Sequence, residues 1–456
     1  MNWAPDLLVG LDLGTTSTKA LLLDRAGNEL ALAAVETPFA TSTDGVEASA
    51  DQLRQTLSQV LAELGAGRQR VAAIGIAGMA ESGAPIDRHG RALAPVIAWH
   101  DQRGADVVAR LDERFGPALP RAIGRRAGTV SSAAKLGWLL DHGVDSVESW
   151  LGVPELCLCW LTGRRATEFS LAARTGWYDV AERRYLPEVA AALGIPACVF
   201  PAVEAAGSVM GRVSAAGAAS CGLPEGAAVT IAGHDHLVGS RGSGARTSDL
   251  VNSVGTAETI VAGDRDFPDV DLALALRVAV TVMPGGKRWA MLASAARSGI
   301  VLAAVADALG CSVGELDERV GASGGTARTV DISRTVDIGD LLGRIERGEP
   351  VASSPDAYGA VWSALLHALA ARTWEGVDRL SQVTGPFSRL VVFGGGSRSR
   401  PWLAAKSDLG PMPVWRSGTT EAVARGAALF GGVAAGWWPS TDQGPQATLE
   451  PITGAV

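Results

Sequence analysis

The sequence predicts an α/β protein built from two copies of one fold that face each other across a cleft. The first half orders its predicted elements as three strands, a helix, a strand and a helix, which is the order of an α/β layer. Each half opens with a hairpin that turns at Gly-Thr, at residues 14–15 and 255–256. A chain of 456 residues also exceeds the size at which one core keeps growing. We place the boundary in the Gly/Ser-rich stretch Arg241–Ser248, which gives domains of residues 1–243 and 244–456.

The first predicted hairpin lies in VGLDLGTTSTKALLLD, residues Val9–Asp24. Leu7–Leu11 and Ala20–Leu23 are apolar runs of strand length, and Gly14 lies between them as a turn signal. The turn AGNE then leads to a third apolar run, Leu30–Val35. These runs predict a meander of three strands.

A helix and a buried strand are predicted next. Ser49 and Gln52 form a capping box, and leucines and a valine keep helical spacing from Leu53 until Gly65. The uninterrupted apolar stretch VAAIGIAG, Val71–Gly78, is typical of a strand that is buried on both faces.

The second half begins with a similar pattern. LVNSVGTAETIVAG, Leu250–Gly263, again places Gly-Thr between two apolar runs, and Arg277–Ala295 predicts a hairpin that turns at Pro284–Gly286. RLVVFGGGSRSR follows as a strand that ends in three glycines before a helix near Ser399. The short echo RTVDISRTVDI, Arg328–Ile338, predicts an irregular surface segment.

Composition excludes several classes of partner. The net charge of −8 and the lack of a basic stripe argue against nucleic acid. No stretch of 18 uninterrupted apolar residues and no signal-like N-terminus occur, so we expect a cytoplasmic protein with no membrane partner. Five cysteines favour reduced thiols, and Cys157 with Cys159 lacks a second pair for a zinc site.

The turn of the first hairpin is rich in polar groups that can bind ligands. Small hydroxyl residues and exposed backbone N–H groups can hold an anion, and Asp12 can hold a divalent cation through oxygen. This combination suggests a nucleotide phosphate with magnesium. The alternative from this segment alone is an ordinary polar hairpin.

Asp235 is the candidate general base. It follows the apolar strand of TIAGHDHLVGSRGSG, and an acid at the carboxyl end of a strand is a common catalytic arrangement in α/β folds. With an ordinary pKa near 3.9, Asp235 needs no special shift to be ionised at neutral pH. His234 and His236 share one face if the strand continues, so a metal site with two histidines is the alternative.

Two further side chains suit a polyhydroxylated ligand. Glu81 follows a predicted strand and can accept hydrogen bonds from hydroxyl groups, and the indole of Trp99 can cover a C–H face. The structural alternative makes Trp99 a core residue, with Asp101 a helix cap that pairs with Arg103 at the surface.

Together, these stretches resemble the FGGY carbohydrate kinases, the family of xylulokinase and glycerol kinase. The resemblance covers about residues 8 to 436, through GLDLGTTSTKALLLD, IAGHDHLVGSRGSG, NSVGTAETI, VVFGGGSRSRPWLAAKSDLG and TTEAVARGAALFGGVAAG, in the family's order. It implies two duplicated ribonuclease H-like domains of the actin-like ATPase type around a central cleft. It also implies ATP and Mg²⁺ as cofactors and a small sugar or polyol as substrate, and it leaves open whether the chain forms a homodimer.

The resemblance assigns roles to individual positions. Asp12 is expected to hold magnesium through water, and Asp235 to act as the base. The resemblance implies ATP phosphate contacts for Thr15, Thr16, Lys19, Gly255 and Thr256, and nucleoside contacts for Gly395, Gly396 and Ser399.

Departures from the family pattern limit the substrate to a linear ketose or sugar alcohol of three to six carbons. In GMAESG, Glu81 occupies the position of a histidine in xylulokinases, and Ala80 occupies that of an arginine in glycerol kinases. Trp99 resembles the substrate tryptophan of glycerol kinases, and His236, where Gln or Asn is frequent, is expected to contact substrate. The alternative function is an actin-like ATPase that acts as a chaperone or regulatory module, since fold alone does not separate the two.

Overall fold

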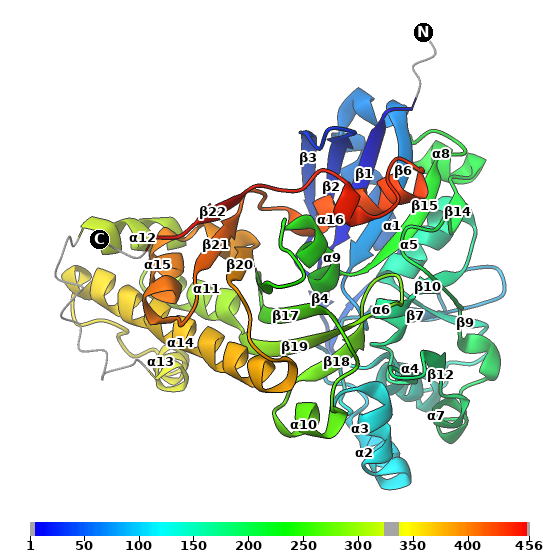
Figure 1. The fold of residues 1–456 in the computed structure, drawn as a ribbon. Helices are drawn as coiled ribbons and strands as arrows, with labels where there is room; N and C mark the ends of the chain where they lie inside the picture. Colours follow the sequence, from blue (N-terminus) through cyan, green and yellow to red (C-terminus); the bar gives the residue numbers. More distant parts are fainter. Residues whose placement is uncertain (1–4, 323–336, 454–456) are drawn as a thin grey trace. The chain divides into compact units, whose positions relative to one another are not determined.

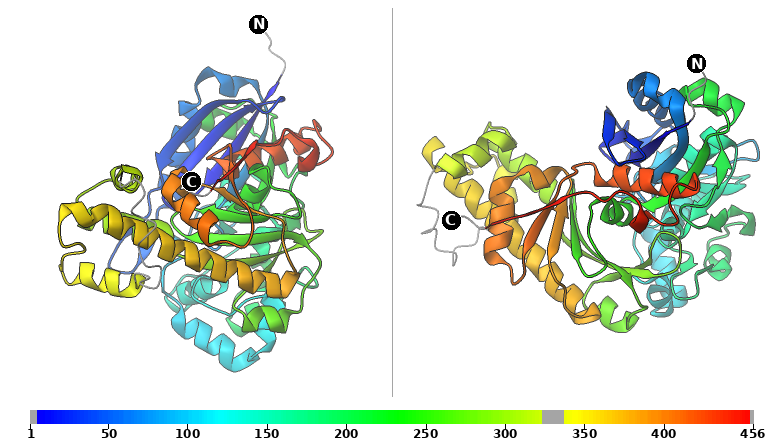
Figure 2. Two further views of the ribbon diagram at one scale, coloured as in Figure 1. Left: turned by 60° about the vertical axis from the view of Figure 1, so that its left-hand side comes forward. Right: turned by 45° about the horizontal axis from the view of Figure 1, so that its top comes forward.

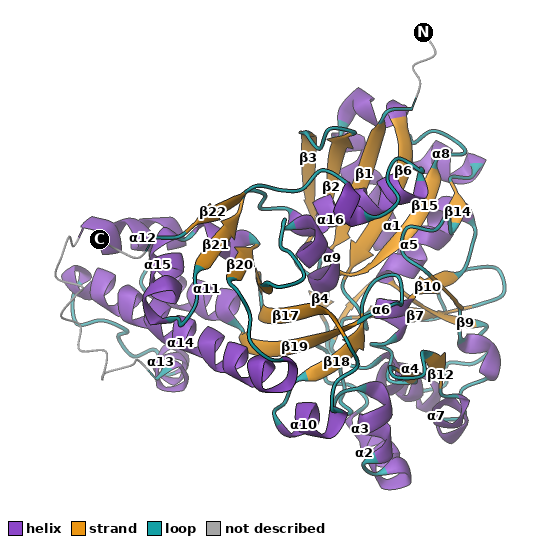
Figure 3. Cartoon of the chain, in the orientation of Figure 1, coloured by secondary structure: helices purple, strands orange, loops and turns teal. Residues whose placement is uncertain are grey.

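A computed structural model describes residues 5–322 and 337–453, and these fold into two compact units (Figure 1). The first unit comprises the described residues up to Gly242 together with 263–291 and 421–446. The second comprises 243–262, the described residues between 292 and 420, and those from 447 onward. Both hold strands and helices, as predicted (Figure 3). Of the echo Arg328–Ile338, residues 328–336 lie outside the described residues.

The main sheet of the first unit contains the predicted meander. Its strand order is β14-β15-β6-β1-β2-β3, with β1 antiparallel to β2, β2 antiparallel to β3, and β6 parallel to both β1 and β15. The strands are β1 (Leu7–Leu13), β2 (Ser17–Asp24), β3 (Glu29–Glu36), β6 (Val71–Gly78), β14 (Gly211–Arg212) and β15 (Ala228–His234). The prediction of β6 is confirmed at both ends.

The register of the three parallel strands aligns their carboxyl ends. Leu13 of β1 pairs with Gly78 of β6, which pairs with His234 of β15. Residues that end or follow these strands therefore meet at one edge of the sheet, where α/β folds bind ligands.

Helix α16 (Ala422–Ala434) covers one face of this sheet at very short range (Figure 2). A Cβ atom on Gly10 would lie 1.8 Å from the Ala424 carbonyl oxygen, and one on Gly75 would lie 1.7 Å from that of Ala427. Only glycine allows the helix backbone to approach β1 and β6 this closely. This contact fixes the start of α16, and with it Glu421, beside the first hairpin.

The sheet that contains β16 and β20 repeats the topology of the main sheet of the first unit. Its order is β18-β19-β17-β16-β20-β21-β22, with β16 antiparallel to β17, and with β20 parallel to both β16 and β21. Thus β16, β17 and β19 correspond to β1, β2 and β3, while β20 and β21 correspond to β6 and β15. The strands are β16 (Leu250–Val254), β17 (Glu258–Arg265), β18 (Ala279–Val282), β19 (Trp289–Ala296), β20 (Leu390–Phe393), β21 (Val414–Ser417) and β22 (Leu449–Pro451).

A buried ion pair ties three helices of the second unit to β17. Glu258 accepts from Lys406 Nζ at 2.5 Å and from Thr373 Oγ1 and Ser298 Oγ at 2.6 Å each, and both charged side chains are fully buried. Ser298, Thr373 and Lys406 belong to three different helices. The helices of this unit are α11 (Ser298–Ala308), α12 (Val313–Ala322), α13 (Ile338–Glu346), α14 (Tyr358–Thr384) and α15 (Arg400–Leu409).

The remaining elements belong to the first unit. The capping box is confirmed: Ser49 caps α1, and Gln52 accepts from the Ser49 backbone N–H at 3.3 Å. A second sheet has the order β4-β5-β8-β7-β9, and two pairs are β10-β13 and β11-β12. The bounds are β4 (Ala40–Thr41), β5 (Val46–Ala48), β7 (Gly83–Ile86), β8 (Val96–Ile97), β9 (Ser149–Gly152), β10 (Ala166–Glu168), β11 (Tyr178–Asp179), β12 (Arg184–Tyr185) and β13 (Ala202–Glu204) for strands, and α1 (Ala50–Glu63), α2 (Ala105–Phe115), α3 (Ala118–Ile123), α4 (Ser132–Asp141), α5 (Val153–Thr162), α6 (Phe169–Ala172), α7 (Pro187–Ala192), α8 (Ala215–Cys221), α9 (Asp235–Gly242) and α10 (Val270–Ala275) for helices.

Among the described residues, no single helix is long and apolar enough to cross a membrane. One bent pair, Ser298–Ala308 with Val313–Val320, reaches the threshold by length and composition, as core helices of other proteins also do.

Candidate functional site

Three acidic residues follow or end the aligned strands of the first sheet. Asp12 is the second-last residue of β1. Glu81 comes three residues after β6, and Asp235 begins α9 directly after β15. The structure therefore brings the predicted metal, substrate and catalytic residues of the first unit to one sheet edge. This follows from the parallel register, because the carboxyl ends of the three strands coincide.

The predicted phosphate turn is braced from the end of β3. The Thr37 hydroxyl donates to the Gly14 carbonyl at 2.7 Å, and the Thr37 backbone N–H donates to the Thr16 carbonyl at 3.0 Å. Thr16 is exposed and Thr15 partly exposed, so both can reach a ligand. Lys19 stands opposite Asp12 in the ladder, and its ammonium donates to Glu421 at 2.6 Å.

The charge around Asp12 suits a divalent cation. Burial, and after it the negative charge of Asp235, raise the pKa of Asp12 to about 7, whereas Lys19 lowers it. Glu421 adds a further negative charge near the same carboxylate. Mg²⁺ prefers oxygen ligands such as these carboxylates. Its charge would also relieve the repulsion between them that is not compensated by Lys19.

Asp235 lies between two imidazoles. Its Oδ1 is 3.2 Å from His234 Nε2 and 4.0 Å from His236 Nε2, and it accepts from the His236 backbone N–H at 2.6 Å. Strand alternation does not explain this arrangement, because β15 ends at His234 and the next two residues are helical. The three ligand atoms still lie within 4.8 Å of one another, so the alternative metal site keeps a geometric basis.

The expectation of an ordinary pKa for Asp235 is wrong. Burial raises its pKa, although the neighbouring His236 lowers it. Burial also holds the pKa of His234 well below its ordinary value, so this imidazole is neutral. A carboxylate with a raised pKa is a stronger base once it is ionised, which suits proton abstraction at neutral pH.

Glu168 supports the end of β15 from behind. It accepts from the Ser170 hydroxyl at 2.5 Å and from the Gly285 backbone N–H at 2.7 Å. The Ser170 oxygen in turn accepts from the His234 backbone N–H at 2.9 Å. Burial raises the pKa of Glu168 to about 7. This chain of hydrogen bonds holds the backbone one residue before Asp235.

Glu81 is held by two arginines that the sequence analysis did not identify. Its Oε1 is 2.7 Å from Arg174 Nη2 and 3.6 Å from Arg125 Nη2, and the three side chains are largely buried. Burial, and then the charge of Arg174, lower the pKa of Arg125 to about 9, so it stays protonated at neutral pH. Glu81 also adopts φ = 67°, a left-handed conformation that is rare for this residue type and that clusters at functional sites.

Trp99 connects the predicted substrate and phosphate residues. Its indole N–H donates to Thr15 Oγ1 at 2.8 Å, and its ring packs on the core from a partly exposed position. Asp101 and Arg103 instead form a structural pair at 2.9 Å, and Asp101 also accepts from the Val46 backbone N–H. Asp101 is not a helix cap, since the cap of α2 is Gly104.

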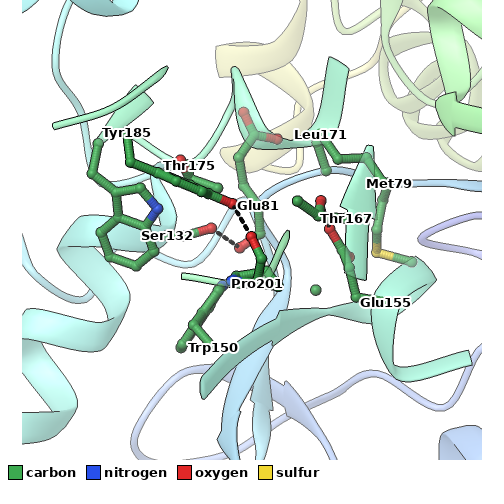
Figure 4. Close-up of a pocket in the computed structure, with 13 residues that line it drawn as sticks. Met79, Glu81, Ser132, Trp150, Glu155, Thr167, Leu171, Thr175, Tyr185 and Pro201 are labelled. Carbon is green, nitrogen blue, oxygen red and sulfur yellow. Dashed lines mark hydrogen bonds between the residues drawn. The ribbon is translucent and has the colours of Figure 1, made fainter. Parts of the chain in front are cut away.

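A small cavity lies behind Glu81 (Figure 4). Its volume of about 20 Å³ offers room for about one water molecule, not for a sugar. Ser132 Oγ is 3.5 Å from the Glu81 carbonyl oxygen, and Tyr185 donates to the Pro201 carbonyl oxygen at 2.8 Å, as the dashed lines show. On its wall, Glu155 accepts from the Thr167 hydroxyl at 2.5 Å.

The predicted nucleotide residues of the second unit occupy two turns. Gly255 and Thr256 are exposed between β16 and β17, and the Gly255 backbone N–H donates to the Ala257 carbonyl. Gly395 and Gly396 begin a short 3₁₀ turn after β20. Ser399 is buried and caps α15 through the Trp402 backbone N–H at 3.3 Å, so a structural role already accounts for its hydroxyl.

Residues 7–242 match the N-terminal domain, and residues 348–435 the C-terminal domain, of the FGGY family of carbohydrate kinases. The chain belongs to this family. It is therefore an ATP-dependent phosphotransferase that phosphorylates a sugar or polyol. The comparisons give no support to the alternative of a chaperone or regulatory ATPase.

Relatives of similar identity carry different substrate names. The chain is 27% identical to the L-fuculokinase of Escherichia coli K12, over 96% of this chain and 94% of the relative. It is 28% identical to the glycerol kinase of Bordetella parapertussis, over 96% and 91%. The crystal structure of xylulose kinase from Rhodospirillum rubrum is 25% identical, with a TM-score of 0.81 over 98% of this chain and 94% of that one. The predicted fold class, α/β with two ribonuclease H-like domains, is confirmed.

Proposed function

We propose that this carbohydrate kinase transfers the γ-phosphoryl group of ATP to a hydroxyl of a small linear ketose or sugar alcohol, with Asp235 as the general base. The observation that carries the proposal is the meeting of Asp12, Glu81 and Asp235 at the carboxyl edge of one sheet. Phosphoryl transfer needs positioning, charge neutralisation and a proton acceptor, and these three carboxylates suit those tasks.

In the proposed reaction, the acceptor hydroxyl gives its proton to the Asp235 carboxylate. The oxygen of the acceptor hydroxyl forms a bond to the γ-phosphorus of ATP. The bond from that phosphorus to the β–γ bridging oxygen breaks, so that ADP leaves. The neutral His234 and the backbone N–H of His236 keep the carboxylate oriented. The raised pKa of Asp235 favours proton acceptance.

Asp12 would hold Mg²⁺ through water, and the ion would neutralise charge on the β- and γ-phosphates. We assign phosphate contacts to Thr15, Thr16, Lys19, Gly255 and Thr256, and nucleoside contacts to Gly395, Gly396 and Ser399. In this division, residues 1–243 supply the sugar, metal and part of the phosphate contacts, and residues 244–456 supply the remaining contacts to the nucleotide. We propose a cytoplasmic enzyme without nucleic-acid or membrane partners.

Glu81, Trp99 and His236 form the proposed sugar site. The ion pair with Arg174 fixes Glu81 Oε1 in place, so that this carboxylate can accept hydrogen bonds from substrate hydroxyls. Trp99 would cover a C–H face of the carbon chain. Ala80 stands where glycerol kinases have an arginine. In the proposed site, Arg125 and Arg174 supply guanidinium groups in its place.

The direct test is ADP release from ATP and Mg²⁺ in the presence of individual ketoses and polyols of three to six carbons. We expect saturable, acceptor-dependent ADP release with at least one of them, and the phosphorylated product by mass spectrometry. Release of ADP that no acceptor stimulates would contradict the proposal.

A further inference from the structure

The hydrogen bond from Trp99 to Thr15 joins residues that are 84 positions apart in the chain. The Trp99 backbone is fixed at two further points: its N–H donates to Ser82 Oγ at 2.8 Å, and its carbonyl accepts from Lys135 Nζ at 3.2 Å. The indole is therefore attached to a rigidly held backbone.

The chemistry of the two groups decides the direction of the bond. An indole N–H is a donor only, so it occupies a lone pair of the Thr15 hydroxyl oxygen. The hydroxyl hydrogen must then point away from Trp99. As a donor, this hydroxyl contacts Met79 Sδ at 4.0 Å, and a thioether is a weak acceptor. A stronger acceptor, such as a phosphate oxygen, would capture that hydrogen.

The backbone of the turn contributes little freedom. Thr37 holds the carbonyl oxygens of Gly14 and Thr16, on both sides of Thr15. What remains adjustable is the rotation of the Thr15 hydroxyl, and the indole N–H controls it.

We infer that Trp99 is a positioning residue for phosphoryl transfer, whose indole N–H presents the Thr15 hydroxyl as a hydrogen-bond donor to a nucleotide phosphate. This inference rests on the proposed function, in which Thr15 contacts the phosphates of ATP and the ring of Trp99 covers the sugar. One side chain then connects the sugar surface with the phosphate turn.

A double-mutant cycle on nucleotide binding tests the inference without turnover. The dissociation constant of Mg·AMP-PNP, an ATP analogue that is not hydrolysed, would be measured calorimetrically for wild type, Trp99→Phe, Thr15→Val and the double variant. We expect each single variant to bind about 2- to 10-fold more weakly, the range of one neutral hydrogen bond. The double variant should bind no more weakly than Thr15→Val, because the indole acts only through that hydroxyl.

The matched control is Trp289→Phe, which removes an indole bond of 2.7 Å to the Val180 carbonyl. It should leave AMP-PNP affinity unchanged. If Thr15→Val fails to fold, as judged by its melting temperature, Thr15→Ser replaces it: the hydroxyl remains, so Trp99→Phe should still weaken binding in that background.

Effects of Trp99→Phe and Thr15→Val that simply multiply would overturn the inference, as would a wild type that does not bind AMP-PNP. Kinase assays in parallel separate the two claims. If Trp99 and Thr15 are coupled in a protein that phosphorylates no sugar or polyol, the proposed function fails, and the inference is reduced to the positioning of the Thr15 hydroxyl for nucleotide binding. If Trp99 and Thr15 are not coupled in an active kinase, this inference fails and the proposed function stands.

Discussion

The ammonium of Lys19 lies 2.6 Å from Glu421, although 402 positions separate them in the chain. Lys19 stands directly opposite Asp12 on the neighbouring strand, so its charge is divided between two carboxylates. Burial, and after it the negative charge of Asp235, which Lys19 compensates only in part, raise the pKa of Asp12 to about 7. A divalent cation would relieve this repulsion, which is why we place the metal at Asp12.

Replacement of Asp12 by alanine should suppress Mg²⁺-dependent turnover by about 10²-fold or more, because Mg²⁺ at the reacting phosphates would lose the carboxylate that holds it. Nucleotide affinity should change far less. The measurement is turnover against Mg²⁺ concentration, with AMP-PNP binding in parallel. Asp44→Ala, at an exposed loop position, is the control. Wild-type turnover in Asp12→Ala would refute the metal assignment.

Glu81→Gln should raise the Michaelis constant for the sugar and leave that for ATP nearly unchanged. The amide keeps the size of the side chain, but it loses the charge that Arg174 holds and accepts hydrogen bonds more weakly. Glu155→Gln is a matched control, since Glu155 lies on the cavity behind Glu81 and bonds to Thr167. Equal changes in both Michaelis constants, or none, would count against a sugar contact.

The local parts of the fold could be predicted from sequence because their signals are local. The capping box of α1, the turn at Gly14 and the apolar run of β6 each lie within a few residues of the structure they specify. The acid after β15 could be found for the same reason.

The surroundings of the site could not be predicted in this way. Arg174 reaches Glu81 across 93 positions of sequence, and Glu421 reaches Lys19 only because glycines let α16 lie on the sheet. No local pattern marks these residues, because long-range packing creates their contacts. The raised pKa of Asp235 likewise depends on burial, which its neighbours in sequence do not specify.

Glu168 should give the protein a measurable pH dependence of stability. Its pKa is raised by burial from 4.5 to about 7 in the folded state, so the folded state binds more protons than the unfolded state between these values. Stability should therefore fall as pH rises from about 4.5 to 7, by up to about 3 kcal/mol from this group. Urea unfolding of wild type and Glu168→Gln across this range should show a shallower decline in the variant, and parallel curves would show that Glu168 does not titrate there.

The buried pair Glu258–Lys406 should be a major determinant of stability in the second unit. Lys406→Met removes the cationic partner and leaves a buried carboxylate in contact with the hydroxyls of Ser298 and Thr373, which typically costs about 3 to 5 kcal/mol. The control is Glu375→Gln, which breaks an exposed pair with Arg372 and should cost about 1 kcal/mol or less. Urea unfolding monitored by circular dichroism measures both, and similar losses would show that burial does not set the difference.

The central claim is that Asp235 accepts the proton of the attacking hydroxyl. Asp235→Asn preserves size and packing but removes the basic oxygen, and Asp408→Asn, in α15, is the matched control. The deciding measurement is the turnover number of Asp235→Asn with saturating ATP, Mg²⁺ and the best acceptor, beside its melting temperature and AMP-PNP affinity. We predict a loss of turnover of about 10²-fold or more, with folding and nucleotide affinity preserved. A folded Asp235→Asn enzyme with near-normal turnover would contradict the account and return His236 and Glu81 to consideration as the base.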